Sequence, residues 1–390
     1  PDGNHLEESG GDGGMKWEYK TLDQLGTVSR GKSKHRPRND PKLFGGKYPF
    51  IQTADVKNAD YYITKYSDTY NESGLAQSKL WDKGTLCITI AANIADTGVL
   101  AFPACFPDSI MGFAPFEGVA NTRFIKYCFD RLQRDCKQIS QGTAQDNLSW
   151  EKLSTIKFCI PEYKEQCRIA DILSAYDDLI ENNQKQIKLL EEAAQRLYKE
   201  WFLDLRFPGH ENTKIVDGVP EGWSRGLLKE LISVNYGKDH KKAPDDGNIP
   251  VYGSGGLMRK CNKSLFSGEA VLIPRKGSLN NIMYVDETFW TVDTMFYATM
   301  KQPHTAVFVY FFVKAFDMYS MNIGAAVPSM TTKILDAMDV VIPDKETLEK
   351  FDKLTKTYFN KIKTLQGQNE RLKTARNLLL PKLMSGEVEV

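Results

Sequence analysis

The chain has 390 residues, 41% of them hydrophobic, and a formal net charge of +1. This length allows two or three domains with their own cores. The longest apolar run, Ala306 to Val313, is far shorter than the ~20 residues of a membrane helix, and we see no secretory signal pattern. We therefore expect a cytoplasmic protein without membrane contact. The near-neutral charge does not mark a nucleic-acid binder, so the local distribution of charge must be considered.

Seven cysteines and five histidines are scattered without any C-x-x-C spacing. This pattern argues against a zinc site or a disulfide framework and favours a reducing compartment. Residues 1–14, PDGNHLEESGGDGG, have the composition of a tag or a disordered tail. Residues 15–160 are predicted to form a first globular domain, β-rich but mixed, because β-branched and aromatic residues are punctuated there by glycine and proline.

Gly26 to Ser33 read GTVSRGKS, a literal match to the phosphate-binding loop G-x-x-x-x-G-K-S. Such a loop follows a buried strand and opens a helix. Here the preceding TLDQL looks helical, and Pro37 and Pro41 prevent the following segment from forming a helix. We therefore interpret the match as a coincidence rather than a nucleotide site.

The same loop is strongly basic. A charge run is most simply a solvated surface, but this one recurs at the matching place in the second half, which favours contacts to phosphates. Other basic pairs lie near a glycine-rich turn and after a VLIP strand, and Asn93 is the polar counterpart in the first half. The candidate DNA contacts are Arg30, Lys32, Ser33, Lys34, His35, Arg36, Arg38 and Asn93, and Lys238, His240, Lys241, Lys242, Arg259, Lys260, Arg275, Lys276 and Ser278. Because the two sets differ, the two halves are expected to read different bases.

Residues 161–207 carry apolar side chains on a 3.5-residue period, the pattern of a coiled-coil seam. One heptad position holds Ile169, Tyr176, Leu190 and Leu197, and the other holds Leu173, Ile180, Ile187, Ala194 and Trp201. An ordinary core helix gives a similar stripe. A repeat of roughly forty residues is nevertheless much longer than a typical helix of about a dozen. Asn183 is the one polar residue in this predicted seam.

The two halves of the chain repeat. Gly142 to Pro161 resembles Gly324 to Pro343, and Trp17 to Leu25 resembles Trp223 to Leu231. The repeat predicts a second domain at residues 208–342, followed by a second long helix at residues 343–390.

Two helices with one apolar seam each can bury those seams against each other. An antiparallel pair would form a rod of roughly 50 Å with one domain at each end. The predicted fold class is therefore α+β: two β-rich mixed domains in a pseudo-twofold arrangement, separated by two long helices that form an antiparallel coiled coil. Symmetry of the rod would bring Asn183 opposite Asn369, and we predict that these two side chains fix the register.

No catalytic constellation stands out. The N-P-P-Y-type loop and glycine-rich cofactor loop of methyltransferases that modify base amino groups do not appear. No convincing set of nuclease carboxylates appears either, and the Glu191-Glu192 pair is more simply a solvated helix face. We therefore expect a chain without catalysis of its own.

Together these features resemble the specificity (S) subunit of type I restriction-modification systems. The resemblance covers the chain from Met15 onward. It rests on the repeat and on the segments WEYKTLDQLGTVSRGKS, GWSRGLLKELISVNYGK, IPEYKEQCRIADILSAYDDLIENNQKQI, LYKEWF and NLLLPKLMSGEV. It implies two target-recognition domains, each reading one half of a bipartite sequence in double-stranded DNA, held apart by the paired helices.

The resemblance also implies partners. Two modification subunits would methylate adenine with S-adenosylmethionine, and restriction subunits would complete an ATP-dependent nuclease. No cofactor is expected on this chain, whereas S-adenosylmethionine, ATP and Mg are expected on the partner subunits. Apolar residues near the helix ends are candidates for packing against the modification subunits: Trp201, Phe202, Leu380 and Leu383.

Two alternatives stay open. A coiled-coil protein-interaction scaffold without DNA binding would explain the neutral charge equally well, and in that case the two basic loops need not face one side, as a single duplex requires. An ATP-using enzyme built on GTVSRGKS would need Lys32 in a strand-to-helix turn.

Overall fold

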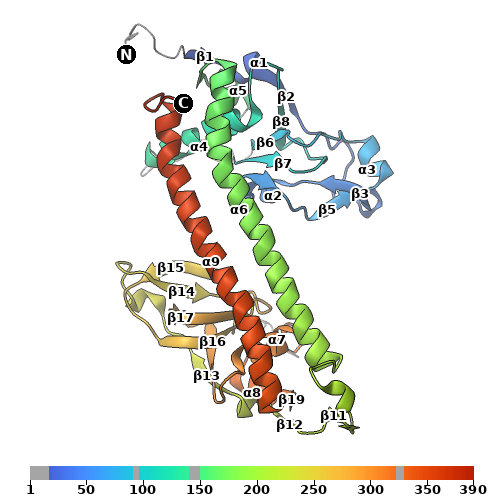
Figure 1. Ribbon diagram of the computed structural model, residues 1–390. Helices are drawn as coiled ribbons and strands as arrows, with labels where there is room; N and C mark the ends of the chain where they lie inside the picture. The colour runs from blue at the N-terminus through green and yellow to red at the C-terminus, as the bar shows by residue number, and fades with distance from the viewer. Residues whose placement is uncertain (1–16, 91–95, 140–149, 322–328) are drawn as a thin grey trace. The chain divides into compact units, whose positions relative to one another are not determined.

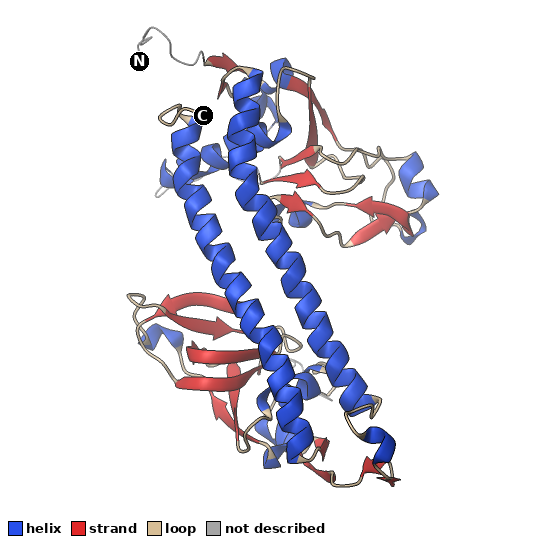
Figure 2. Cartoon of the chain, viewed as in Figure 1, coloured by secondary structure: helices blue, strands red, loops and turns tan. Residues whose placement is uncertain are grey.

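The computed structural model describes residues 17–90, 96–139, 150–321 and 329–390. The chain divides into two compact units, Pro1–Asn182 together with Gln368–Val390, and Asn183–Gly367. Two long helices, α6 (Tyr163–Tyr198) and α9 (Lys345–Met384), each continue from one unit into the other (Figure 1). Each unit therefore combines strands and short helices with a segment of both long helices (Figure 2).

The first unit is built on a five-stranded sheet of order β2-β8-β6-β7-β4. Neighbouring strands are antiparallel except β4 and β7, which are parallel. Two ribbons, β1-β9 and β3-β5, complete it. The strands are β1 (Glu18–Lys20), β2 (Gly26–Arg30), β3 (Phe44–Phe50), β4 (Tyr62–Ile63), β5 (Asp68–Tyr70), β6 (Leu86–Thr89), β7 (Thr97–Leu100), β8 (Ile110–Pro115) and β9 (Phe158–Ile160). The short helices are α1 (Leu22–Leu25), α2 (Thr53–Lys57), α3 (Glu72–Ala76), α4 (Thr122–Ile139) and α5 (Trp150–Thr155).

The second unit contains a six-stranded sheet of order β13-β18-β16-β17-β14-β15 and the ribbons β12-β19 and β10-β11. The strands are β10 (Ile215–Val216), β11 (Val219–Pro220), β12 (Ser224–Leu227), β13 (Ile232–Tyr236), β14 (Ile249–Gly253), β15 (Gly256–Cys261), β16 (Phe266–Pro274), β17 (Met283–Thr291), β18 (Met295–Met300) and β19 (Asp339–Ile342). The short helices are α7 (Ala306–Lys314) and α8 (Thr332–Asp336).

The two sheets share one topology. The order β2-β8-β6-β7-β4 matches β13-β18-β16-β17-β14, with the parallel pair in the same place. In each unit a strand near the start of the domain also pairs with the strand just before the long helix: β1 with β9, and β12 with β19. The predicted internal repeat and the α+β class are thus confirmed. The additions differ, because β15 extends only the second sheet and the β3-β5 ribbon belongs to the first unit.

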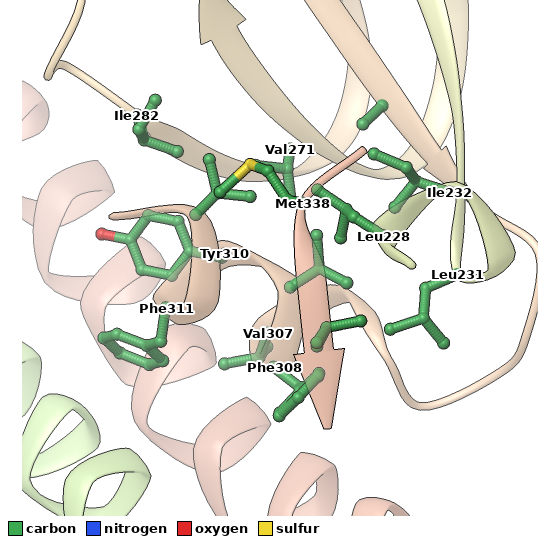
Figure 3. Close-up of a cluster of buried hydrophobic side chains, with 14 of the residues drawn as sticks. Leu228, Leu231, Ile232, Val271, Ile282, Val307, Phe308, Tyr310, Phe311 and Met338 are labelled. Atoms are coloured by element: carbon green, nitrogen blue, oxygen red, sulfur yellow. The ribbon is translucent and has the colours of Figure 1, made fainter. Parts of the chain in front are cut away.

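Each unit has a core that includes both long helices. In the first unit, side chains of the sheet and of α4 pack with Leu173 of α6 and Leu383 of α9. In the second unit, Tyr198 of α6 and Phe351 of α9 pack with the sheet and with α7. Figure 3 shows part of that second core, where Phe308 and Phe311 of α7 lie in a cluster with Val271 of β16 and with Leu228, which precedes β13.

The long helix α6 buries part of the predicted seam and leaves Tyr176, Ile187 and Leu190 partly exposed. Ile169, Leu173 and Ile180 of α6 are buried. Inside the first unit the two helix segments are antiparallel, because Asp177 pairs with Arg376 while the earlier Arg168 donates to the carbonyl of the later Val390. The α6 helix ends sooner than the predicted residue 207, since a π-helical turn at Lys199–Leu203 follows it.

Asn183 and Asn369 are both buried. They belong to different units, so their mutual contact stays a prediction. Asn183 is the one polar residue at the predicted heptad positions of α6, and Asp177, which lies between those positions, is buried as well. A single carboxylate between apolar heptad positions can be buried when a distant part of the chain supplies its partners.

Candidate nucleic-acid interface

The GTVSRGKS segment is not a phosphate-binding loop. Gly26–Arg30 is strand β2, which pairs with β8, and the described residues from Gly31 to Asp40 form no helix. The four-residue helix α1 precedes β2, as predicted. A nucleotide loop needs the reverse order, with a strand before the loop and a helix after it, so the ATP-using alternative is wrong.

The two Gly–Lys turns have the same backbone anchoring. After β2, Gly31 N–H donates to Ile110 O (2.9 Å) and Lys32 N–H donates to Phe106 O (3.0 Å). After β13, Gly237 N–H donates to Met295 O (3.0 Å) and Lys238 N–H donates to Thr291 O (2.9 Å). Glycine is required at both positions, because a Cβ would lie 2.3 Å from Phe106 O or 2.0 Å from Val292 O. Lys32 and Lys238 therefore occupy equivalent positions, each just after a strand in its own domain.

In the first loop, some basic residues hold the loop and others are exposed without an acidic partner. Arg38 forms two hydrogen bonds with the Asp108 carboxylate, at 2.7 and 2.8 Å. Arg36 donates to two carbonyl groups of its own loop. Arg30, Lys32 and Lys34 are exposed, and no carboxylate contact is seen for them in the described part of the chain. These three cations are therefore available to an anionic ligand.

His35 and Asp40 close the first loop, with 2.9 Å between His35 Nε2 and the carboxylate. The backbone N–H of Lys42 and the His35 ring donate to this carboxylate and hold the pKa of Asp40 below its ordinary value. Asp40 therefore stays ionised near neutral pH.

A hollow of about 360 Å³ opens beside this loop, with Ser33, Arg38, Gln52 and Asp68 among its lining residues. Gln52 donates to Asp68 at 2.7 Å. The Ser33 hydroxyl is buried and has no hydrogen-bond partner within the described residues. The hollow thus combines hydroxyl, amide and charged groups, which can pair with the edges of bases. Asn93, predicted to act in the first domain, lies outside the described residues.

The second loop exposes Lys238, Lys241 and Lys242, with His240 partly buried between them. Arg259, also predicted to contact DNA, has an internal role instead. Its guanidinium pairs with the Asp245 carboxylate and donates to the carbonyls of His240 and Ala243. Arg259 therefore holds this loop against β15, and sequence patterns could not reveal this because the pairing depends on how the sheet brings the segments together. Lys260, the next residue, is exposed.

Arg275, Lys276 and Ser278 follow β16 and reach the same end of the sheet as Lys238. The strands β13 and β16 are both antiparallel to β18, so their carboxyl ends lie at one edge. Asn281 also belongs to this group, since its amide donates to Ser254 O (2.8 Å) in the turn after β14. The structure thus brings the second-half candidates together, and it adds Asn281 and the ring of Tyr236, which sequence patterns did not single out.

The four apolar residues expected to contact modification subunits are instead packed inside this chain. Trp201 is buried and Phe202 is partly buried in the core of the second unit, whereas Leu380 and Leu383 are buried in the core of the first. The expectation is corrected, because the helix segments carrying these residues form part of each unit's core. A different apolar set is exposed on the helices: Leu179, Leu189, Leu354 and Leu378.

Across the described side chains, no group of three or more His, Cys, Asp or Glu is placed to hold a metal ion. None of the described helices is both long and apolar enough to cross a membrane.

The chain thus consists of two domains of one topology, each with a basic Gly–Lys turn at the same end of its sheet. A family model described as "Type I restriction modification DNA specificity domain" matches residues 15–192 and 220–374. The chain therefore belongs to this family, the DNA sequence-specificity subunits of type I restriction-modification systems.

Two curated relatives and one solved structure match large parts of the chain. The Type I restriction enzyme MjaIX specificity subunit of Methanocaldococcus jannaschii is 26% identical, over 96% of this chain and 94% of that protein. The HindI specificity subunit of Haemophilus influenzae is 23% identical over 62% of this chain and 71% of that protein. A crystal structure of a type I S subunit from M. genitalium has the same fold, with a TM-score of 0.60 at 18% identity and coverage of 95% of this chain and 97% of that one.

Proposed function

We propose that each domain reads one half of a bipartite DNA sequence with the end of its sheet that carries the Gly–Lys turn, while α6 and α9 set the gap between the halves. The observation that carries this proposal is that exposed basic residues follow both β2 and β13, on turns held by equivalent backbone hydrogen bonds. Lysines held at equivalent points suit contacts to phosphates, which position a protein on a duplex without reading sequence.

The two half-sites differ in sequence under this proposal. Arg30 ends β2 at the place where Tyr236 ends β13, and the hollow beside Ser33 is lined by first-domain residues such as Gln52 and Asp68. Base edges are distinguished by their pattern of donors and acceptors. The two domains share one sheet topology but carry different side chains at this end of the sheet, so they read two different half-sites.

The chain acts as the non-catalytic subunit of a larger cytoplasmic complex. Two modification subunits carry S-adenosylmethionine and methylate adenine, and restriction subunits carry ATP and Mg. The scaffold alternative is less well supported, since family membership concerns DNA specificity. In this complex the present chain chooses the sequence and the partners perform the chemistry.

Replacing Lys32 or Lys238 by alanine is expected to weaken DNA binding and to lower its salt dependence. Each lysine that neutralises a phosphate contributes about 0.9 to the slope of log affinity against log salt concentration, so each variant should lose about one unit of slope. The measurement is binding of the purified full chain to duplex DNA over a salt series. Lys83→Ala is the matched control, because Lys83 is exposed and precedes β6, at the opposite end of the sheet. Equal slopes for all three variants and the unaltered chain would refute the assignment of these loops.

A further inference from the structure

Arg275 is held more rigidly than the exposed basic residues around it. Its guanidinium carbon lies 4.9 Å from the ring centroid of Tyr236 and 5.1 Å from that of Phe296. One Nη1 N–H donates to Asp293 O at 2.8 Å. The backbone is fixed as well, since Arg275 N–H donates to Thr294 O (2.8 Å) and Met330 N–H donates to Arg275 O (2.9 Å). The side chain therefore loses little further freedom when it meets a ligand.

The charge of Arg275 is not neutralised by a carboxylate among the described residues. In this respect it differs from two other candidate arginines, because Arg38 pairs with Asp108 and Arg259 pairs with Asp245. One N–H of Arg275 Nη1 and both N–H groups of Nη2 have no acceptor within the described part of the chain, whereas Nε is buried. The guanidinium thus retains donors at its outer end, away from Nε.

The surroundings of Arg275 suit the approach of a duplex. Tyr236, which supports the guanidinium, is the last residue of β13 and precedes the Gly237-Lys238 turn. Lys276 is exposed beside Arg275. Two lysines therefore flank a fixed, planar pair of donors, and guanine presents the matching pair of acceptors, N7 and O6, in the major groove.

We propose that Arg275 reads a guanine in the half-site of the second domain, through N7 and O6 in the major groove, while Lys238 and Lys276 contact flanking phosphates. This inference rests on the proposed function and specifies one recognised base, guanine, and the residue that reads it. A phosphate contact needs only a positive charge, whereas a planar guanidinium held against two aromatic rings presents its N–H donors in fixed directions.

The test maps methylated sites in cells that carry the whole restriction-modification system with R275A, R275K or the control K276A. For R275A, one guanine in one half of the split motif should become degenerate, with a loss of preference on the order of ten- to a hundredfold, and the other half should be unchanged. R275K keeps the positive charge but lacks the paired guanidinium donors, so it should restore the preference for guanine only in part. K276A should lower methylation at all sites without changing the motif. A motif that stays strict in R275A, or full rescue by R275K, would overturn the assignment.

A second measurement covers the case in which R275A abolishes methylation. Duplexes carry 7-deazaguanine, which lacks the N7 acceptor, at each guanine of the motif in turn, and their binding to the purified complex is compared for the unaltered chain and R275K. One such replacement should weaken binding by the unaltered chain about tenfold or more and by R275K much less. Equal losses for both proteins at every position would rule out reading by Arg275. Absence of any split motif with the unaltered chain would instead contradict the proposed function itself.

Discussion

Replacing Arg376 by methionine should lower the free energy of unfolding of the first unit by about 3–5 kcal/mol, the usual cost of leaving one member of a buried ion pair alone. Arg376 contacts the Asp177 carboxylate, and the two side chains are 16% and 2% exposed. The Tyr127 hydroxyl donates to the same carboxylate at 2.5 Å. This cluster joins α4, α6 and α9, so its loss weakens the attachment of both long helices to the first domain. Amide hydrogen exchange in α4 measures the effect.

Two controls separate the ion pair from other effects. Arg371→Met removes an exposed arginine from the same helix and should change the stability by less than about 0.5 kcal/mol. The double variant D177L/R376M should recover much of the loss, because two apolar side chains leave no buried charge behind. If R376M costs no more than R371M, the buried pair does not stabilise the unit.

The R376M variant should also acquire a distinctive pH dependence. Burial raises the pKa of Asp177 above its ordinary value even though Arg376 and Tyr127 oppose the shift, and loss of Arg376 removes the main opposing charge. The folded state then binds a proton that the unfolded state has released. The stability of R376M, relative to the unaltered chain, should therefore be highest below pH of about 4 and fall as the pH rises through the folded pKa of Asp177.

Removing one heptad from both long helices should shorten the gap in the recognised sequence by up to about three base pairs. Seven residues span about 10 Å of helix, and base pairs are spaced at about 3.4 Å. Suitable deletions are residues 184–190 of α6 and 361–367 of α9, beside the division between the two units. Because whole heptads are removed, the apolar seam keeps its period. The measurement is the methylated motif in cells carrying the shortened chain.

The matched control deletes residues 184–190 alone. One shortened helix has no equally shortened partner, so this variant should lose stability and methylation together. A double deletion that methylates a motif with the original gap would show that the helices do not set the spacing.

Sequence patterns predicted the duplication because both halves kept landmark residues at the points where the backbone has least freedom. Gly31 and Gly237 are the clearest cases, since neighbouring carbonyl oxygens leave no room for a side chain at either. The long helices were also predictable, because a heptad period is visible along a continuous stretch of chain.

The chemical roles of single residues were less predictable. Arg259 and Arg275 both belong to basic dipeptides, yet Arg259 is neutralised by Asp245 and Arg275 packs against two aromatic rings. The Asp177–Arg376 pair joins residues that are distant in the chain, and Trp201 and Leu383 are buried where exposure was expected. In each case the outcome depends on long-range packing, which local pattern and charge do not determine.

The most direct test of DNA sequence specificity is a map of N6-methyladenine in host cells with and without this gene. We expect a split motif with two different halves to be methylated in the parent cells, to lose its methylation when the gene is deleted, and to regain it when the gene is restored. An identical set of methylated motifs in parent and deletion cells would contradict the assignment of this chain as the subunit that selects the sequence.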